Sequence, residues 1–337
     1  MTPTGNRAAA NLFERSRVCL APMAGYTDAP LRLICSELGA DFTFTEMVSA
    51  DGLIRGGEKT IALMRRLDGE APLGVQIFGS NAEVMGAAAE LAEGAGASFI
   101  DINFGCPVKK VVRKNGGAAL MRDIPLMERI AREVVSRASV PVTAKIRSGW
   151  SAAEENFLEA GEALERCGVA AVTLHPRLRT EGFGGAARWE HIAAMRERLS
   201  IPVIANGDIR SAADYREMAR VTGCTLAMIG RGALGNPWIF REIMEDARGG
   251  PQREVEAAGL LAVIERHLML EAAFKGERTA VREMRKFYRW YLRSYEGIKR
   301  YRRMLVSAES IAAVREIIDD LKKELGVHGR NTAQAAS

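Results

Sequence analysis

The sequence has few cysteines, no paired cysteine motif and no long apolar run. Its five cysteines stand far apart and never form a CxxC pair, which argues against a disulfide framework, a zinc ribbon or an iron–sulfur site. No run approaches the roughly 18 to 20 apolar residues that a membrane span needs. The opening segment MTPTGNRAAANLFERSR lacks the apolar block of a secretory signal. We therefore expect a cytoplasmic protein with reduced thiols, no membrane segment and no bound metal.

The chain also has little net charge, but its charge is unevenly distributed. The 337 residues carry +5 in total. Residues 275–303 hold 11 basic and 3 acidic side chains, a local charge of +8, which leaves −3 for the rest of the chain. Such an asymmetry suggests that a polyanionic partner docks near the C-terminal end.

Short apolar runs rich in β-branched residues alternate with longer helical patterns. Alternation of this kind favours a parallel sheet, and eight is the number of strands that closes a barrel. We predict an α/β fold, a (β/α)8 TIM barrel, with a doubly wound open sheet as the alternative. The eight predicted strands are 18–23, 42–46, 73–78, 99–103, 142–146, 171–175, 203–206 and 226–230.

The pattern changes beyond the barrel. Residues 247–256 contain a Gly-Gly-Pro breaker, which is typical of a linker. Helical spacing then dominates to about Leu325 and predicts a C-terminal all-α domain. The predicted domains are a barrel over residues 1–246, a linker over 247–256, a helical domain over 257–325 and a disordered tail over 326–337.

Polar side chains gather where the predicted strands end. Because side chains alternate along a strand, each of four pairs shares one face. Barrel enzymes build their active sites at the carboxyl ends of the strands, so this placement favours the closed barrel. The pairs are Asp101 with Asn103, Lys145 with Arg147, His175 with Arg177, and Asn206 with Asp208, and Gln76 and Arg231 join them.

Two glycine-bearing turns follow the last two predicted strands. Gly207, Gly230 and Gly232 would let backbone N–H groups approach a phosphate, and Arg231 would supply charge. In a closed barrel these turns lie side by side, where such barrels bind phosphate.

Four motifs give the chain a specific resemblance. They are APMAGYTDAPLR at 21–32, TEMVSA at 45–50, QIFG at 76–79 and DINFGCPVKKV at 101–111. With the later segments PVTAKIRSGW, HPRLRTEGFGGAARW, PVIANGDI and MIGRGALGNPWIF, they resemble the tRNA-dihydrouridine synthases over roughly residues 18–325. The bacterial B-type branch is the most similar. The resemblance implies an FMN-binding barrel followed by a helical tRNA-binding domain, and a monomer with no obligate protein partner.

The resemblance also implies an activity, which is reduction of the uracil C5–C6 double bond in the D-loop of tRNA. NADPH would reduce FMN, reduced flavin would give hydride to C6, and the thiol of Cys106 would protonate C5. That role needs a neutral thiol, and an unperturbed cysteine, with a pKa of about 8.5, is mostly protonated at pH 7.

The remaining site residues are implied by their match to the family motifs. Asn103 would contact the uracil edge, and Arg177 would contact either uracil or a phosphate. Leu178, Phe183 and Gly184 depart from the usual Thr, Tyr and Ser, which affects how this loop meets substrate. Pro22, Met23 and Ala24 would contact the flavin ring, Gln76, Lys145 and His175 its polar edge, and Asn206, Gly207, Asp208, Gly230 and Arg231 the ribityl chain and phosphate.

Two stripes run along the helical segment that follows residue 276. Arg282, Lys286, Arg289 and Arg293 recur at helical spacing with few acidic neighbours, and we interpret them as a phosphate track for tRNA. The other stripe is typical of a core face and consists of Met284, Phe287, Tyr288, Tyr291 and Tyr295.

Two other functions remain open at this point. A small-molecule flavin oxidoreductase of the dihydroorotate dehydrogenase kind would share the barrel and cofactor but would not need the basic helical segment. A non-catalytic tRNA-binding protein with an inactive barrel would not need Cys106, Lys145 and both glycine-bearing turns.

Overall fold

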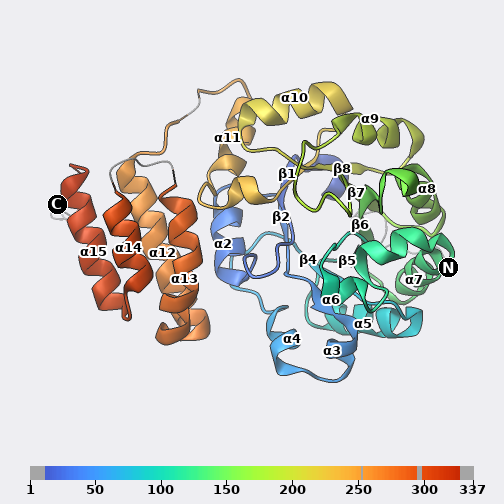
Figure 1. Cartoon of the computed structure of the whole chain (residues 1–337), viewed down its shortest axis with the longest axis horizontal. Coiled ribbons are helices and arrows are strands. Elements are labelled where there is room, and N and C mark those ends of the chain that lie inside the picture. Colours follow the sequence, from blue (N-terminus) through green and yellow to red (C-terminus); the bar gives the residue numbers. More distant parts are fainter. Residues whose placement is uncertain (1–11, 252, 294–297, 327–337) are drawn as a thin grey trace, which may run out of the picture. The chain divides into compact units, whose positions relative to one another are not determined.

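Nine strands, all paired in parallel, lie at the centre of the computed structural model, which describes residues 12–251, 253–293 and 298–326. The chain divides into two units, one of Met1–Ala233 with Ile239–Gly250 and one of Leu234–Trp238 with Pro251–Ser337. All nine strands belong to the first unit (Figure 1). They are β1 (Val18–Leu20), β2 (Phe42–Phe44), β3 (Val48–Ser49), β4 (Leu73–Phe78), β5 (Phe99–Asn103), β6 (Val142–Gly149), β7 (Ala171–Leu178), β8 (Val203–Asn206) and β9 (Ala227–Ile229).

Eight of these strands close into a barrel. β1 pairs with both β2 and β9, and β2 pairs with β4, so the sheet has no open edge. The two-residue strand β3 pairs with the far end of β4. The closed parallel barrel that the alternating pattern predicts is therefore confirmed, and the open doubly wound sheet is excluded.

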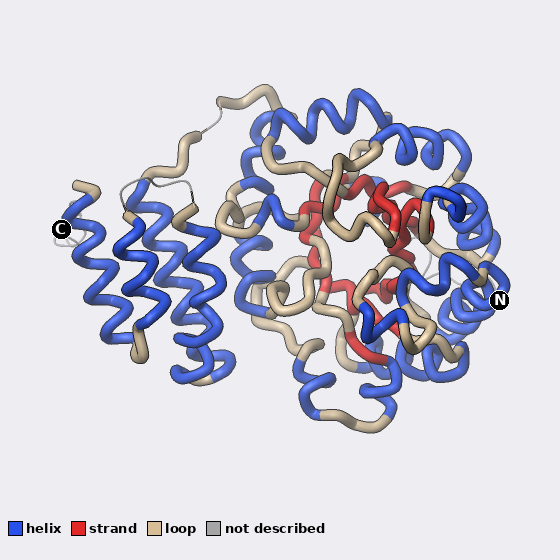
Figure 2. Tube along the Cα trace, in the orientation of Figure 1, coloured by secondary structure: helices blue, strands red, loops and turns tan. Residues whose placement is uncertain are grey.

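Helices surround the strands on the outside (Figure 2). The side chains of Asp28, Asn81 and Asp123 each accept a backbone N–H in the first turn of the helix that follows, which is why those helices begin where they do. The helices of this unit are α2 (Ala29–Glu37), α3 (Ala50–Ile54), α4 (Glu58–Ala62), α5 (Ala82–Gly94), α6 (Lys109–Val112), α7 (Ile124–Arg137), α8 (Phe157–Arg166), α9 (Trp189–Arg198), α10 (Ala212–Thr222) and α11 (Ile239–Asp246), with short 3-10 turns at Gly117–Arg122, Ala152–Glu154 and Arg231–Ala233.

Aromatic side chains fill the amino-terminal end of the barrel. Phe42, Phe44 and Phe99 extend from β2 and β5, and Phe13 packs against them from the segment before β1. Their ring centroids lie 5.2 to 5.7 Å apart in edge-on contacts. Edge-to-face packing places the positive rim of one ring on the negative face of the next. This end of the barrel is therefore a packed core.

The inward-facing side chains become polar toward the other end of the barrel. Along β5, Phe99 is followed on the same face by Asp101 and then by Asn103. In the sheet register Asp101 lies opposite Thr143, and Asn103 lies opposite Lys145. The same strands thus supply hydrophobic packing at one end and polar groups at the other.

A prediction about stability follows from the aromatic end. A Cβ built on Gly74 would overlap the ring of Phe99, so we expect Gly74→Ala to lower the free energy of unfolding by roughly 1–3 kcal/mol. The control is Gly94→Ala at the end of α5, where a Cβ would meet no atom within 4 Å. Thermal unfolding of the two variants makes the comparison, and equal melting temperatures would contradict the expected clash.

The second unit contains four helices among its described residues. They are α12 (Ala257–Lys275), α13 (Glu277–Tyr291), α14 (Lys299–Ser307) and α15 (Ile311–Glu324). Met284, Phe287, Tyr288 and Tyr291 are buried, which confirms the interpretation of that stripe as core. Tyr295 and residues 327–337 of the expected tail lie outside the described residues. In the described segments, no helix is long and apolar enough to cross a membrane.

Candidate active site

A row of hydrogen-bonded polar side chains crosses the barrel from β6 to β4. Thr143 Oγ1 donates to Asp101 Oδ1, and Gln76 Nε2 donates to Asp101 Oδ2, each at 2.6 Å. Gln76 Oε1 accepts from Asn103 Nδ2 at 2.8 Å. Burial raises the pKa of Asp101 to about 6, although the donors Gln76 and Thr143 act to lower it. Asp101 thus fixes which way the Gln76 amide points, and Gln76 in turn orients Asn103.

Asn103 holds the loop that carries Cys106. Its Oδ1 accepts the backbone N–H groups of Gly105 and Cys106, at 3.1 and 2.9 Å. On the other side, the carbonyl of Cys106 accepts from the N–H of Ala118 at 3.0 Å. A Cβ on Gly117, whose φ is +58°, would lie 2.8 Å from that carbonyl oxygen. The loop is therefore held by close contacts on both sides of the cysteine.

Cys106 is only 7% exposed. Burial raises the pKa of this thiol above its usual value, which outweighs the lowering effect of the Val108 N–H and of the Arg147 and Lys145 charges. The thiol is therefore protonated at neutral pH. A protonated thiol can act as a proton donor, whereas nucleophilic attack requires a thiolate. The other four cysteines are buried as well, as expected of small core residues: Cys19, Cys35, Cys167 and Cys224.

Asn206 brings Lys145 and His175 together. Its Nδ2 donates to the carbonyl of Met228 at 2.7 Å, which directs its Oδ1 toward the other two side chains. Lys145 Nζ donates to this oxygen at 3.0 Å, and His175 Nδ1 lies 2.8 Å from it. Because an amide oxygen only accepts hydrogen bonds, Nδ1 is the protonated nitrogen of His175.

Burial sets the charge of both groups. It lowers the pKa of Lys145 to about 7, and the neighbouring Arg147 contributes in the same direction. Burial, aided by Lys145 and Arg147, also holds the pKa of His175 well below its usual range. His175 is therefore neutral at pH 7, and its Nε2, 3.5 Å from Arg177 Nη1, acts as an acceptor. Lys145 is close to the midpoint of its titration.

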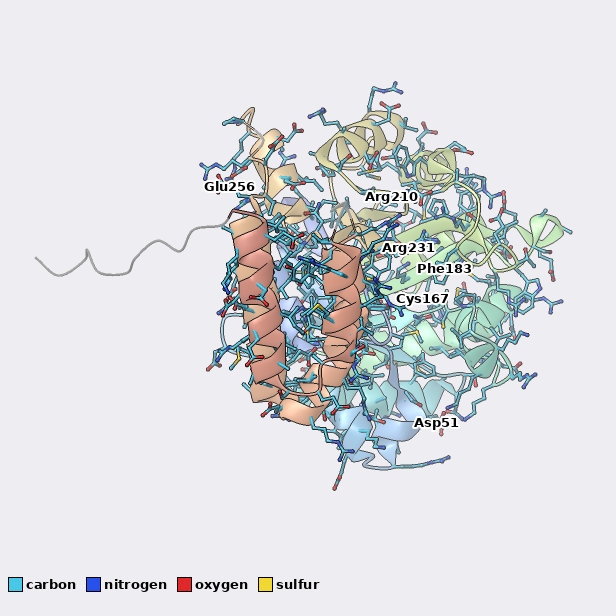
Figure 3. All side chains as sticks on the ribbon, turned by 60° about the vertical axis from the view of Figure 1, so that its left-hand side comes forward. Asp51, Cys167, Phe183, Arg210, Arg231 and Glu256 are labelled. Atoms are coloured by element: carbon cyan, nitrogen blue, oxygen red, sulfur yellow. The ribbon has the colours of Figure 1, made fainter. Side chains whose placement is uncertain are left out.

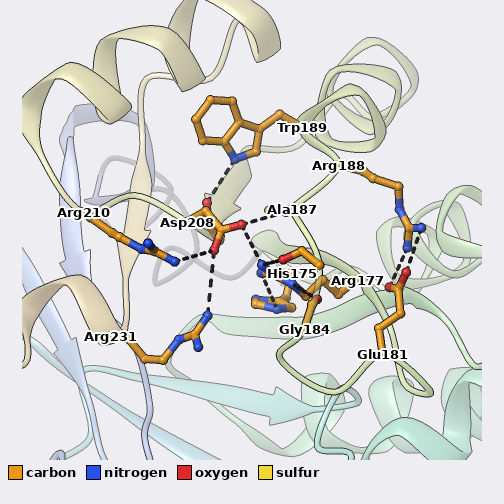
Figure 4. A network of polar contacts seen from close by, with 12 residues as sticks. His175, Arg177, Glu181, Gly184, Ala187, Arg188, Trp189, Asp208, Arg210 and Arg231 are labelled. Carbon is orange, nitrogen blue, oxygen red and sulfur yellow. Dashed lines mark hydrogen bonds and ion pairs between the residues drawn. The ribbon is translucent and has the colours of Figure 1, made fainter.

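Arg177 forms an internal network with Asp208 and the loop after β7 (Figure 4). Its Nη2 donates to Asp208 Oδ2 and to the carbonyl of Gly185, each at 2.6 Å, and its Nε donates to the carbonyl of Gly184 at 2.9 Å. The side chain of Arg177 is 1% exposed. Arg177 thus holds the loop after β7, and its expected contact with uracil or a phosphate stays a prediction.

Asp208 also accepts the backbone N–H of Ala187 at 2.8 Å. Burial acts to raise its pKa, but the bonds from Ala187 and Arg177 outweigh this effect and lower the pKa. Arg210 and Arg231 lie 3.7 and 3.8 Å from its other oxygen (Figure 4). A carboxylate would repel a phosphate. Asp208 is therefore suited to orient these two arginines and not to contact a phosphate bound at the glycine-bearing turns.

The glycine-bearing turns after β8 and β9 lie beside this network. Gly207 has φ +126°, a conformation that few other residues adopt, and its carbonyl accepts from Trp189 Nε1 at 3.0 Å. A Cβ on Gly230 would lie 3.8 Å from Met23 Sδ, so the turn after β9 borders the segment after β1. In that segment Pro22 and Met23 are half-buried and Ala24 is exposed.

The barrel thus gathers predicted site residues into two hydrogen-bonded clusters. Gln76, Asn103 and the Cys106 loop are connected through hydrogen bonds, and Lys145, His175 and Asn206 form a second cluster. Arg147 was expected on the same face as Lys145, but it had been given no role in the site. Arg147 is 3% exposed, and its Nε donates to the carbonyl of Gly105 at 2.8 Å. Strand alternation predicts the shared face, but it does not reveal that Arg147 bonds the loop before Cys106.

The predicted phosphate track lies on α13 and just beyond it. Arg282, Arg289 and Arg293 are exposed. Lys286 differs, because its Nζ pairs with Glu283 at 3.0 Å and lies 5.0 Å from the Phe287 ring centroid. Three of the four predicted cations are therefore exposed to solvent.

Comparison with known proteins gives one consistent result. The model of the dihydrouridine synthase (Dus) family matches residues 19–334. The tRNA-dihydrouridine synthase B of Pseudomonas putida is 42% identical over 304 residues, covering 89% of each chain. The protein of the same name from Escherichia coli K12 is 39% identical over 309 residues, covering 90% of this chain and 95% of its own.

Solved structures with little sequence similarity share the barrel fold. The histamine dehydrogenase of Rhizobium sp. 4-9 aligns with a TM-score of 0.54 at 14% identity, over 92% of this chain and 62% of its own. A 6-hydroxypseudooxynicotine amine oxidase of Pseudomonas geniculata aligns with a TM-score of 0.55 at 14% identity, over 77% of this chain and 53% of its own. This chain therefore spans less than two thirds of either protein.

Proposed function

The chain belongs to the dihydrouridine synthase family, and from this premise we propose that it reduces uridine in tRNA to 5,6-dihydrouridine, with FMN as cofactor and NADPH as electron donor. The observation that carries the proposal is the Cys106 loop. A thiol with a raised pKa is held at the end of the barrel where Lys145, His175 and Asn206 converge. A small-molecule reductase and an inactive tRNA-binding protein are both less consistent with this family membership.

The donors at this end of the barrel suit a flavin. Gln76 Nε2 gives one of its two hydrogens to Asp101, and Lys145 gives one of its three to Asn206, so both keep donors for a ligand. Arg231, with a 46% exposed side chain, stands beside the two glycine-bearing turns and suits a phosphate. Pro22, Met23 and Ala24 offer an apolar surface that is not fully buried. Held by these residues, FMN would supply the hydride chemistry needed at C6 of the uracil ring, with NADPH as the source of electrons.

The protein's own residues would perform the other half of the reaction. Adding a hydride at C6 leaves an electron pair at C5, and Cys106 Sγ–H would supply the proton that completes the C5–H bond. The resulting thiolate would regain a proton from solvent. Asn103 would keep the thiol in place, because it holds the N–H groups of residues 105 and 106. Neutral His175 would contribute as a hydrogen-bonding group and not as a charge.

The test uses the purified full-length protein, reconstituted with FMN, and tRNA from cells that make no dihydrouridine. With NADPH present, we expect nucleoside mass spectrometry to show dihydrouridine formation. Orotate and dihydroorotate in place of tRNA should leave NADPH consumption at its background rate. Failure to take up FMN, or NADPH consumption stimulated by orotate and not by tRNA, would contradict the proposed function.

We further propose that the exposed cations on α13 and just beyond it hold the tRNA backbone. A uridine must leave its stack to reach the barrel, at a cost of a few kcal/mol that phosphate contacts offset. We expect the double variant Arg289→Glu/Arg293→Glu to weaken tRNA binding. Each lost phosphate contact should reduce the slope of log affinity against log salt by about 1.

The control for this variant changes the net charge equally at another place. Arg198 and Arg220, on α9 and α10, are exposed and pair with Glu162 and Glu217. Arg198→Glu/Arg220→Glu should therefore alter the salt slope much less. If both double variants weakened binding equally, general charge and not a track on α13 would explain the effect.

A further inference from the structure

The loop after β7 holds a phenylalanine in solvent. Phe183 is 60% exposed, the highest value for any large hydrophobic side chain among the described residues. Glycines flank it on both sides, and Gly182 and Gly185 have φ values of +61° and +66°. Burying a phenylalanine stabilises a folded protein, and this loop forgoes that gain.

The exposed position of Phe183 is held by two buried arginines. On the N-terminal side of Phe183, Arg147 Nη1 donates to the carbonyls of Gly182 at 2.8 Å and Leu178 at 3.1 Å. On the C-terminal side of Phe183, Arg177 donates to the carbonyls of Gly184 and Gly185. Both guanidinium groups are nearly inaccessible to solvent. Bonds from a charged donor are among the stronger hydrogen bonds in proteins, so the loop is held in one shape.

Cations border the ring. The guanidinium carbon of Arg147 lies 5.6 Å from the ring centroid of Phe183, and that of Arg231 lies 5.5 Å from it. Arg231 and Arg210, both labelled with Phe183 in Figure 3, carry exposed positive charge beside Asp208. A second copy of the same positive surface would be repelled, whereas a nucleic acid offers both a flat apolar ring and a negative phosphate.

The loop is also connected to the cysteine. The guanidinium of Arg147 bonds both the carbonyl of Gly105, immediately before Cys106, and the carbonyl of Gly182, immediately before Phe183. One side chain therefore couples the position of the Cys106 loop to that of the Phe183 loop. Such a link is useful if both positions contact neighbouring nucleotides of one strand.

We propose that Phe183 is a stacking platform for the base next to the uridine that enters the barrel, with the exposed Arg210 available to the phosphates of that strand. The inference rests on the proposed function and adds a recognition residue to it. Base–aromatic stacking contributes enough that its loss would weaken binding roughly 5- to 100-fold. Stacking depends on a π-face and not only on apolar area.

The experiment compares Phe183→Leu, Phe183→Tyr and Phe183→Trp. We expect Phe183→Leu to raise the KM for tRNA roughly 5- to 100-fold, while FMN content and tRNA-independent NADPH oxidation stay at the wild-type level. Phe183→Tyr and Phe183→Trp should retain near-wild-type KM. Leu91→Ala on α5, where Leu91 is 47% exposed, is the control for loss of an exposed apolar side chain.

A second measurement reads stacking directly. A 2-aminopurine placed beside the reduced uridine should lose fluorescence on binding the wild-type protein and lose much less with Phe183→Leu. A wild-type KM for tRNA in Phe183→Leu would overturn the proposal, as would a raised KM for NADPH alone, which would assign the ring to the nicotinamide. Wild-type protein that forms no dihydrouridine would instead refute the proposed function, and this inference with it.

Discussion

Cys106→Ala is expected to lower the rate of dihydrouridine formation by about 10²- to 10⁴-fold, the usual contribution of a positioned general acid. Bound FMN and NADPH oxidation should be unaffected, because the backbone of residue 106, and not its side chain, bonds to Asn103 and Ala118. Mass spectrometry of tRNA nucleosides measures the loss, and absorbance of the bound flavin checks the site. The variant thus separates proton donation from the rest of the reaction.

Cys167→Ala serves as the matched control. Cys167 is also buried and its pKa is also raised by burial, but it lies at the end of α8, where its Sγ donates to the carbonyl of Glu128. We expect that variant to keep normal activity. Full activity of Cys106→Ala would refute the acid role. A loss of flavin from Cys106→Ala would show that the side chain supports the site in another way.

Lys145→Met should produce opposite effects on cofactor binding and on stability. A hydrogen bond from a charged donor is worth roughly 1.5–3 kcal/mol, so we expect FMN to bind about 10- to 100-fold more weakly, as measured by quenching of flavin fluorescence. The flavin-free variant should be more stable than the wild type at pH 7, because it no longer buries an ammonium group. Asn206 Oδ1 keeps the bond from His175 Nδ1.

The pH dependence of this stability has a definite sign. The pKa of Lys145 falls from 10.5 to about 7 on folding, so between these values the unfolded chain binds a proton that the folded protein does not. The free energy of unfolding of the flavin-free wild type therefore rises with pH across that window, as far as Lys145 contributes to it. The advantage of Lys145→Met should be largest at and below pH 7 and should vanish near pH 10.5. If the difference in melting temperature between Lys145→Met and the wild type were the same at every pH, a buried ammonium would be contradicted.

The barrel and its polar end were predictable because their signals are local. Apolar runs mark the strands, and strict alternation places Asp101 with Asn103 and Lys145 with Arg147 on one face. The register of a closed parallel sheet then brings these faces together. The linker pattern at residues 247–256 coincides with the absence of helix and strand at 247–251 and 253–256 among the described residues.

The partners within the site could not be predicted in the same way. Asn103 was expected to contact uracil. In the structure its Nδ2 donates a hydrogen bond to Gln76, and its Oδ1 accepts from the N–H groups of residues 105 and 106. Arg177 was expected to meet substrate, yet it bonds Asp208, 31 positions away. These contacts depend on rotamers and on loop paths, which leave no periodic trace in a sequence. Whether either side chain also reaches a ligand stays a prediction.

Arg147 donates hydrogen bonds to two carbonyls, the one before Cys106 and the one before Phe183. This shared donor limits how the enzyme can be re-engineered. A designer who transplants residues 178–188 from a relative to change which nucleotide is chosen would also disturb the loop of the proposed proton donor, Cys106, because both loops bond the same guanidinium. Selectivity and turnover would then change together. Successful chimaeras should exchange the two loops as a single module, with residue 147 included.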